Sequence, residues 1–195
     1  MMTLALQLAP ARVDGVYRSD GPDDSAPVGI LIRWTGFAKR RPWVSLAALG
    51  AATQAVGLTG VPFTARAIGD WYDKLNKPSF NPPSSVFGPV WTGLYGAMAG
   101  SAWLVSRAEA SDRQQRALKL FAGQLVLNAV WTPLFFGAKA PAAALVEISA
   151  LLVAVVATTG ASFAVRPAAG ALLVPYVGWV AFATVLNASI VALNR

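Results

Sequence analysis

Two amides and an indole share one face of an apolar segment in the second half of the chain. In LKLFAGQLVLNAVWTPLFFGAK, helical spacing places on that face Gln124, Asn128, Trp131 and Phe135. Because no water satisfies an amide in hydrocarbon, such groups either hydrogen-bond to neighbouring helices or line a cavity. In the second interpretation, Asn128 and Trp131 present a donor beside a flat apolar wall. The two interpretations are compatible, and both stay open here.

Other tryptophans also stand in patterned surroundings that suit a flat ligand. Trp91 is followed one helical turn later by Tyr95. Trp179 shares a helical face with the small Ala183 and with Leu186, which leaves room beside the indole. Anchoring at a membrane interface is a sufficient explanation for Trp34, Trp43 and Trp103.

The chain contains no cysteine and no histidine, and this excludes several kinds of site. A thiolate nucleophile, a zinc site of the usual ligands and a Ser-His-Asp triad cannot be built, and we expect no metal and no resident cofactor. A bound tetrapyrrole would have to be held by stacking and apolar contact. Glu147 is the one charged residue inside an apolar segment, so it faces a pocket, another helix or the interface.

Five apolar segments must position these residues. The 195 residues are 55% hydrophobic and 13% charged, whereas soluble domains carry roughly 25% charged residues. The segments cover about 43–65, 86–106, 120–138, 140–165 and 168–193, and roughly 20 residues are enough to cross a bilayer as a helix. We therefore expect an all-α membrane protein, a five-helix transmembrane bundle formed by residues 41–195.

The loop between the first two segments is built to hold a shape. It is rich in aromatic residues, and its prolines fix φ and remove donors, so it needs neither a helix nor a sheet to be ordered. The prolines that we assign to it are Pro78, Pro82, Pro83 and Pro89. A structured first loop of this kind can cover a site.

The charges bear on partners and on topology. The net charge is +7, but the basic residues lie between apolar segments without a clustered face for phosphates, so we expect no nucleic-acid partner. A modest excess of Lys and Arg on the N-terminal side predicts that this side faces the positive compartment. Residues 1–40 form an N-terminal extension that we expect to be disordered, because 14–27 is rich in Asp, Gly, Pro and Ser. The alternative is a short amphipathic piece on the membrane surface around 30–37.

Four sequence blocks together resemble the tryptophan-rich sensory protein and mitochondrial translocator protein (TspO/MBR) family. They are WYDKLNKPSFNPP, VFGPVWTGLY, GQLVLNAVWTPLFFGAK and PYVGWVAFATVLN, and they occur in order. The resemblance implies a five-helix bundle, often a homodimer, with a porphyrin-binding cavity open toward the first loop. With Phe135 added from its helical face, the candidate ligand-binding residues are Tyr72 and Pro82 as a lid, Trp91, Tyr95, Asn128, Trp131, Phe135, Glu147, Trp179, Ala183 and Leu186.

We therefore expect a membrane-embedded binding protein or sensor for porphyrins such as protoporphyrin IX, or for other flat apolar ligands. One alternative is light-dependent porphyrin breakdown, with Trp91 and Trp179 as redox partners and no ordinary acid–base groups. Another is transport of a porphyrin or sterol, which the lack of an inverted repeat disfavours. The segment after Asn187 reads ASIVALNR, without the tyrosine of the animal members' proposed cholesterol motif, so a sterol is less favoured. Without a targeting signal, a bacterial cell membrane is expected, with an outer or organelle membrane as alternatives.

Overall fold

The structure, a computed structural model, describes residues 26–195, and every regular element among them is a helix. This confirms the all-α prediction. Residues 1–25 of the expected extension lie outside the described residues. The elements are α1 (Ala26–Arg40), α2 (Pro42–Thr59), α3 (Val61–Ala67), α4 (Trp71–Lys74), α5 (Ser84–Ser106), α6 (Asp112–Thr132), the π-helical turn η1 (Pro133–Gly137), α7 (Pro141–Val165) and α8 (Pro167–Leu193).

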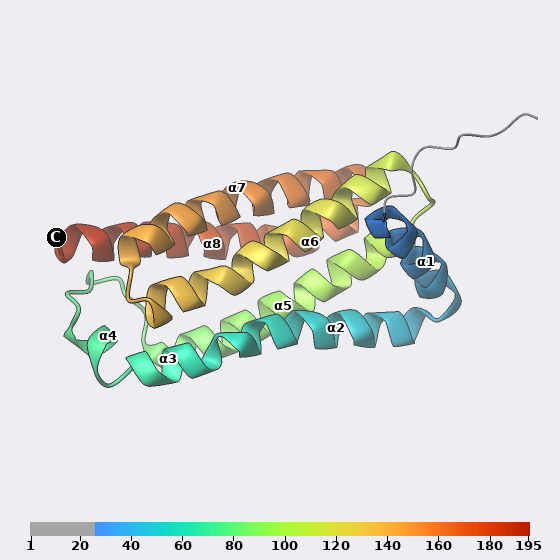
Figure 1. Ribbon diagram of the computed structural model, residues 1–195. Helices are drawn as coiled ribbons and strands as arrows, with labels where there is room; N and C mark the ends of the chain where they lie inside the picture. The colour runs from blue at the N-terminus through green and yellow to red at the C-terminus, as the bar shows by residue number, and fades with distance from the viewer. Residues whose placement is uncertain (1–25) are drawn as a thin grey trace, which may run out of the picture.

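The long helices run back and forth along one axis and form an elongated bundle (Figure 1). α7 packs along α6 and α8, and α5 packs along α2 and α8. The loop that carries α4 lies at the same end of the bundle as the C-terminus, whereas α1 lies at the opposite end (Figure 1). The bundle therefore has a loop end and an α1 end.

Among residues 26–195, four helical stretches are long and apolar enough to cross a membrane: Pro42–Ala67, Asp112–Gly137, Pro141–Val165 and Pro167–Leu193. The expected span at 86–106 corresponds to α5, a continuous helix of 23 residues. Gly, Ser, Thr, Trp and Tyr residues among its apolar positions lower its mean hydropathy. Its residues Leu94, Tyr95 and Met98 are nevertheless buried in the main core cluster. The bundle is thus built from α2–α3, α5, α6–η1, α7 and α8, and all of these except α5 have the mean hydropathy expected of a membrane span.

Proline and serine set several helix boundaries. α2, α7 and α8 each begin with a proline, which suits the first turn because its missing N–H would have no partner there. Ser111 caps α6 by accepting the backbone N–H of Gln114 at 3.2 Å. α5 begins at Ser84, so Pro89, which we had assigned to the first loop, lies inside a helix.

A second proline changes the end of α6. Pro133 follows Thr132 and opens η1, where Ala138 donates its backbone N–H to the Pro133 carbonyl at 2.8 Å. Pro133 itself has no N–H to donate, and the wider turn lets backbone hydrogen bonding continue directly after it. It places Phe135, which is 2% exposed, against the loop end of the bundle.

Residues 26–40, expected as part of a disordered extension, form α1 instead. The Trp34 indole N–H donates to Ser106 Oγ at 3.1 Å, and Ala38 is fully buried. The acidic, glycine- and proline-rich run that suggested disorder ends where the helix begins. From there on, apolar side chains can pack against α2 and α5.

Candidate ligand-binding site

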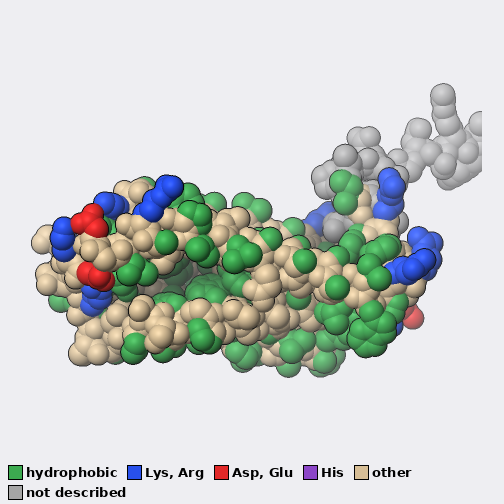
Figure 2. Space-filling view, turned by 90° about the horizontal axis from the view of Figure 1, so that it is seen from below, with side chains coloured by type: hydrophobic (Ala, Val, Ile, Leu, Met, Phe, Trp, Pro, Cys, Tyr) green, Lys and Arg blue, Asp and Glu red, His purple; other side chains and the backbone are tan. Residues whose placement is uncertain are grey.

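A cavity of about 520 Å³ lies between α2–α3, α5 and α6, under the first loop. Figure 2 views the bundle from the α2–α3 side and shows the hollow toward the loop end, with hydrophobic side chains at its bottom. None of the residues that line it is charged. Six of the residues expected from sequence lie in the lining: Tyr72, Pro82, Trp91, Tyr95, Asn128 and Trp131.

The wall contributed by α2 and α3 was not expected, because we nominated no residue from the first segment. Gln54, Gly57, Val61 and Thr64 line it at helical spacing, and this alternation of small and polar side chains is the signal that could have found them. A Cβ on Gly57 would collide with the Tyr95 ring, and one on Gly60 would come within 2.8 Å of Thr132 Cγ2. The two glycines let this wall approach α5 and α6 closely.

Stacked aromatic rings form the walls on α5 and α6. The Trp91 ring stacks on Tyr95 with centroids 5.3 Å apart, and its edge meets Tyr176 at 6.2 Å. The Trp131 ring stacks on Phe135 at 5.1 Å and meets the edge of Phe136 at 6.0 Å. These packed pairs hold two indoles of the lining in fixed orientations.

A buried chain of hydrogen bonds ties this wall together. Tyr95 Oη donates to Asn128 Oδ1 at 2.7 Å, Asn128 Nδ2 donates to Tyr176 Oη at 2.9 Å, and Tyr176 Oη donates to Gln124 Oε1 at 2.9 Å. The chain joins α5, α6 and α8 and is buried throughout. Both amides therefore hold the bundle together, which was the first of our two interpretations.

The second interpretation places Asn128 and Trp131 on a cavity wall, and both residues belong to the lining. Asn128 lines the cavity, as expected. The Trp131 indole N–H, however, donates to Asn187 Oδ1 at 3.2 Å, and Asn187 Nδ2 donates to the Pro141 carbonyl at 2.9 Å. The indole N–H of Trp131 is thus already used inside the protein, and Trp131 offers the cavity its ring surface. Trp91 is the lining indole whose nitrogen makes no hydrogen bond within residues 26–195.

The first loop is fastened over this end of the cavity. Tyr72 Oη donates to Asn81 Oδ1 at 3.3 Å, and the Lys77 ammonium lies 4.6 Å from the centre of the Tyr72 ring. Asn76 and Asn194 form a reciprocal clamp, in which each donates to the other at 2.9 Å. The loop is therefore attached to the C-terminal end of α8 as well as to itself.

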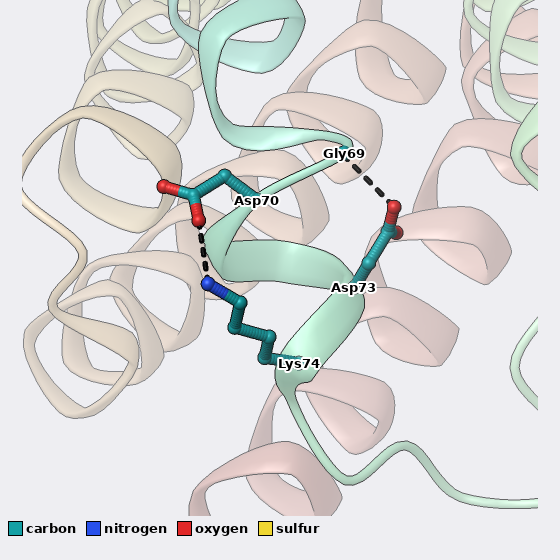
Figure 3. A network of polar contacts seen from close by, with 4 residues as sticks. All are labelled: Gly69, Asp70, Asp73 and Lys74. Carbon is teal, nitrogen blue, oxygen red and sulfur yellow. Dashed lines mark hydrogen bonds and ion pairs between the residues drawn. The ribbon is translucent and has the colours of Figure 1, made fainter.

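A small network of polar contacts lies at the start of the first loop (Figure 3). Lys74 Nζ lies 2.7 Å from Asp70 Oδ1, and the Gly69 backbone N–H donates to Asp73 Oδ2 at 2.9 Å. Gly69 has a φ of 90°, a conformation that other residues adopt only under strain. The hydrogen bond and charge of Lys74 lower the pKa of Asp70, and those of Asp70 raise the pKa of Lys74. Burial raises the pKa of Tyr72 above its ordinary value.

The structure places the other five expected residues outside the lining. Phe135 and Leu186 are buried in the cluster beneath Trp131, and Ala183 packs against the main core. Trp179 meets the edge of Phe87 at 5.7 Å, and it is Phe87 that lines the cavity. Glu147 lies in α7 beside the lining residue Ile148, and its two carboxylate oxygens are buried without a hydrogen-bond partner in the described part of the chain.

The comparison with known proteins agrees with this architecture. The TspO/MBR family matches residues 48–193. A tryptophan-rich sensory protein of Cereibacter sphaeroides is 43% identical over 138 residues, 69% of this chain and 85% of that protein. The human translocator protein is 44% identical over 119 residues, 60% of this chain and 70% of that protein. The tryptophan-rich protein TspO of Archaeoglobus fulgidus is 40% identical over 143 residues, 73% of this chain and 92% of that protein.

The match covers the bundle, the first loop and every residue of the cavity lining. The apolar helices and these relatives together indicate a multi-pass membrane protein. Because the family matches residues 48–193, about three quarters of this chain, the chain belongs to the TspO/MBR family.

Proposed function

We propose that this protein binds a flat, largely apolar ligand of the porphyrin class in the cavity between α2–α3, α5 and α6. The observation that carries the proposal is the cavity itself, about 520 Å³, with Trp91 and Trp131 in its lining. Small-molecule sites typically have volumes of about 300–1,000 Å³ and are mostly apolar with few polar groups. The relatives' names, sensory protein and translocator protein, are consistent with a ligand-binding role.

The way the polar groups are used favours binding by shape and stacking. The amide of Asn128 and the indole N–H of Trp131 are committed to protein partners. What remains on these walls is the indole N–H of Trp91, free within residues 26–195, and a large ring surface, on which a planar aromatic ligand gains stacking and apolar contact. The acidic groups of a porphyrin would remain at the loop end, where Lys77 lies beside the lining residue Tyr72.

The fastened loop provides a route from binding to sensing. Tyr72, Asn81 and Pro82 line the cavity and belong to the loop that Asn194 clamps to α8. A ligand that contacts these residues only when the loop is closed shifts the population toward the closed state.

The photochemical alternative fits this geometry less well. Light-dependent breakdown at a pair of indoles needs both Trp91 and Trp179 beside the ligand, and Trp179 lies behind Phe87. The lining has no charged residue for acid–base chemistry. We therefore place binding ahead of photochemistry.

The test is a titration with protoporphyrin IX, followed by the porphyrin absorption band, on protein in nanodiscs. Gly88→Leu puts a side chain on the cavity face of α5, where a Cβ meets no other atom within 4 Å. Gly93→Leu adds the same side chain to α5 at an equally open position outside the lining. We expect saturable binding that Gly88→Leu weakens about tenfold, a cost of about 1.4 kcal/mol, and that Gly93→Leu leaves unchanged.

The absence of saturable binding to the wild-type protein would remove the porphyrin from the proposal. Equal weakening by Gly88→Leu and Gly93→Leu would instead mean that the porphyrin binds elsewhere or partitions into lipid.

A further inference from the structure

We propose that α1 and the adjoining end of α5 form a binding site for the headgroup of an anionic phospholipid, with Arg107 at its centre. This site lies at the α1 end of the bundle, away from the cavity. Its occupant would be a lipid of the membrane that holds the protein.

The first argument is that α1 is an addition to the family bundle. It covers Ala26–Arg40, whereas the family match begins at residue 48. It crosses the end of the bundle and does not run along the long helices (Figure 1). A helix in this position lies at the level of the lipid headgroups when the long helices span the bilayer.

The second argument is that α1 is held against α5 by specific contacts. The Trp34 indole N–H donates to Ser106 Oγ at 3.1 Å, and Ser106 is fully buried. The Trp34 and Phe37 rings lie 5.6 Å apart, and Ala38 is fully buried. These contacts hold α1 against the end of α5, where Arg107 directly follows Ser106 in the chain.

The third argument is the depth that the tryptophans set. Trp43 is 74% exposed and stacks on Trp103 at 6.1 Å, and the Trp103 indole N–H donates to the Pro42 carbonyl at 2.8 Å. Exposed tryptophans that pair an apolar ring with a polar edge are typical of the membrane interface. The aromatic pair therefore marks the headgroup level at this end of the bundle.

The fourth argument is the state of Arg107. Its guanidinium lies over the Trp103 ring, 4.8 Å from the ring centre. Its Nε is buried and has no hydrogen-bond partner in the part of the chain that the structure describes. Arg107 as a whole is partly exposed, so a phosphate at headgroup level can accept paired hydrogen bonds from the accessible part of the guanidinium, while the buried Nε is not itself the donor.

The surrounding charge favours the same ligand. Lys and Arg side chains lie at both ends of the bundle, but at the loop end they lie among Asp and Glu side chains (Figure 2). Exposed positions on and beside α1 hold Arg33, Lys39, Arg40 and Arg41. The nearby carboxylates Glu109 and Asp112 are exposed, and the ion pair seen within residues 26–195 lies at the other end, between Lys74 and Asp70. Within residues 26–195 no carboxylate pairs with the basic groups at the α1 end, so these groups suit lipid phosphates.

Native mass spectrometry of the full-length protein tests the proposal. The protein in mild detergent is mixed with equal amounts of phosphatidylglycerol and phosphatidylcholine that carry the same acyl chains, and the retained lipids are counted. We expect preferential retention of phosphatidylglycerol, lowered about fivefold by Arg107→Gln, since a basic residue near anionic lipid contributes about that factor. The double variant Arg33→Gln/Arg40→Gln should lower phosphatidylglycerol retention more than Arg107→Gln does.

The matched control is Lys74→Gln/Lys77→Gln, which removes two charges at the loop end and should retain phosphatidylglycerol as the wild type does. Equal retention of the two lipids by the wild-type protein would overturn the proposal. An equal loss in the loop-end control would overturn it too, because retention would then follow net charge alone.

Two further variants cover the case in which Arg107→Gln does not fold. Arg107→Lys keeps the charge but loses the planar pair of donors, and Trp34→Phe removes the hydrogen bond to Ser106 without changing any charge. Both should lower phosphatidylglycerol retention. Wild-type retention in both would contradict a site built from Arg107 and the docked α1.

Discussion

The two walls of the cavity are built on different principles. The α5–α6 wall consists of large rings held by a buried hydrogen-bond chain through Tyr95, Asn128 and Tyr176. The α2–α3 wall consists largely of small residues, and Gly57 and Gly60 touch the opposite wall directly. One wall provides binding surface in a fixed orientation, and the other provides the close approach that gives the cavity its width. The shape of the site therefore depends as much on missing side chains as on those present.

Breaking the hydrogen-bond chain should have the largest effect on stability. Asn128→Ala leaves the hydroxyls of Tyr95 and Tyr176 without their shared partner in a buried region. We expect a loss of about 2 kcal/mol in the free energy of unfolding, measured by thermal unfolding in detergent. Val126→Ala on the same helix removes a side chain that is 65% exposed and should have little effect. Equal stability of the two variants would show that the chain does not hold the rigid wall together.

A side chain on the glycine wall should have the next largest effect. Gly57→Ala forces the Tyr95 ring to move, which disturbs its stacking on Trp91 and its hydrogen bond to Asn128. Overpacking of this kind costs about 1–3 kcal/mol. Gly50→Ala on the same helix meets no atom within 4 Å and should be neutral or slightly stabilising. Equal stability of Gly57→Ala and Gly50→Ala, measured by thermal unfolding in detergent, would show that the close approach of the two walls does not contribute to stability.

Ionisation of the lid residue Tyr72 should have a smaller effect, a loss of stability of the closed loop at high pH. Burial raises the pKa of Tyr72 above its ordinary value of 10.0, and Asp73 raises it further, whereas the hydrogen bond to Asn81 lowers it. The closed loop therefore favours the neutral phenol, and this contribution is complete below pH 10.0 and is lost as the pH rises through the raised value. We expect proteolysis of the loop to accelerate above that pH in the wild type. The acceleration should be absent in Tyr72→Phe, and its persistence there would assign it to another group.

The large residues of the rigid wall could be predicted from sequence, and the glycine wall could not. Trp91 and Asn128 are conspicuous because bulky rings and amides are unusual within an apolar span, and helical spacing puts their neighbours on the same face. Gly57 gives no such signal, because what matters is the close contact that its missing side chain permits. Tertiary packing alone shows that a glycine faces another helix.

Trp179 and α1 show two further limits of the sequence. Spacing groups Trp179 with Ala183 and Leu186, but it does not say which way that face points, and in the bundle Phe87 stands between Trp179 and the cavity. For α1, composition suggested disorder, whereas the contact of Trp34 with Ser106 depends on residues 72 positions apart. Both errors arise because side-chain patterns within one segment do not reveal the segment's neighbours.

The most direct test of the account compares three tryptophans by protoporphyrin titration in nanodiscs. Trp91 lines the cavity, Trp179 lies behind Phe87, and Trp43 is 74% exposed at the α1 end. We expect Trp91→Phe to weaken binding about fivefold, within the 0.5–1.5 kcal/mol typical of one aromatic contact. Trp179→Phe and Trp43→Phe should bind as the wild type does. Unchanged affinity in Trp91→Phe, or a greater loss in Trp179→Phe, would contradict a ligand held on the α5–α6 wall.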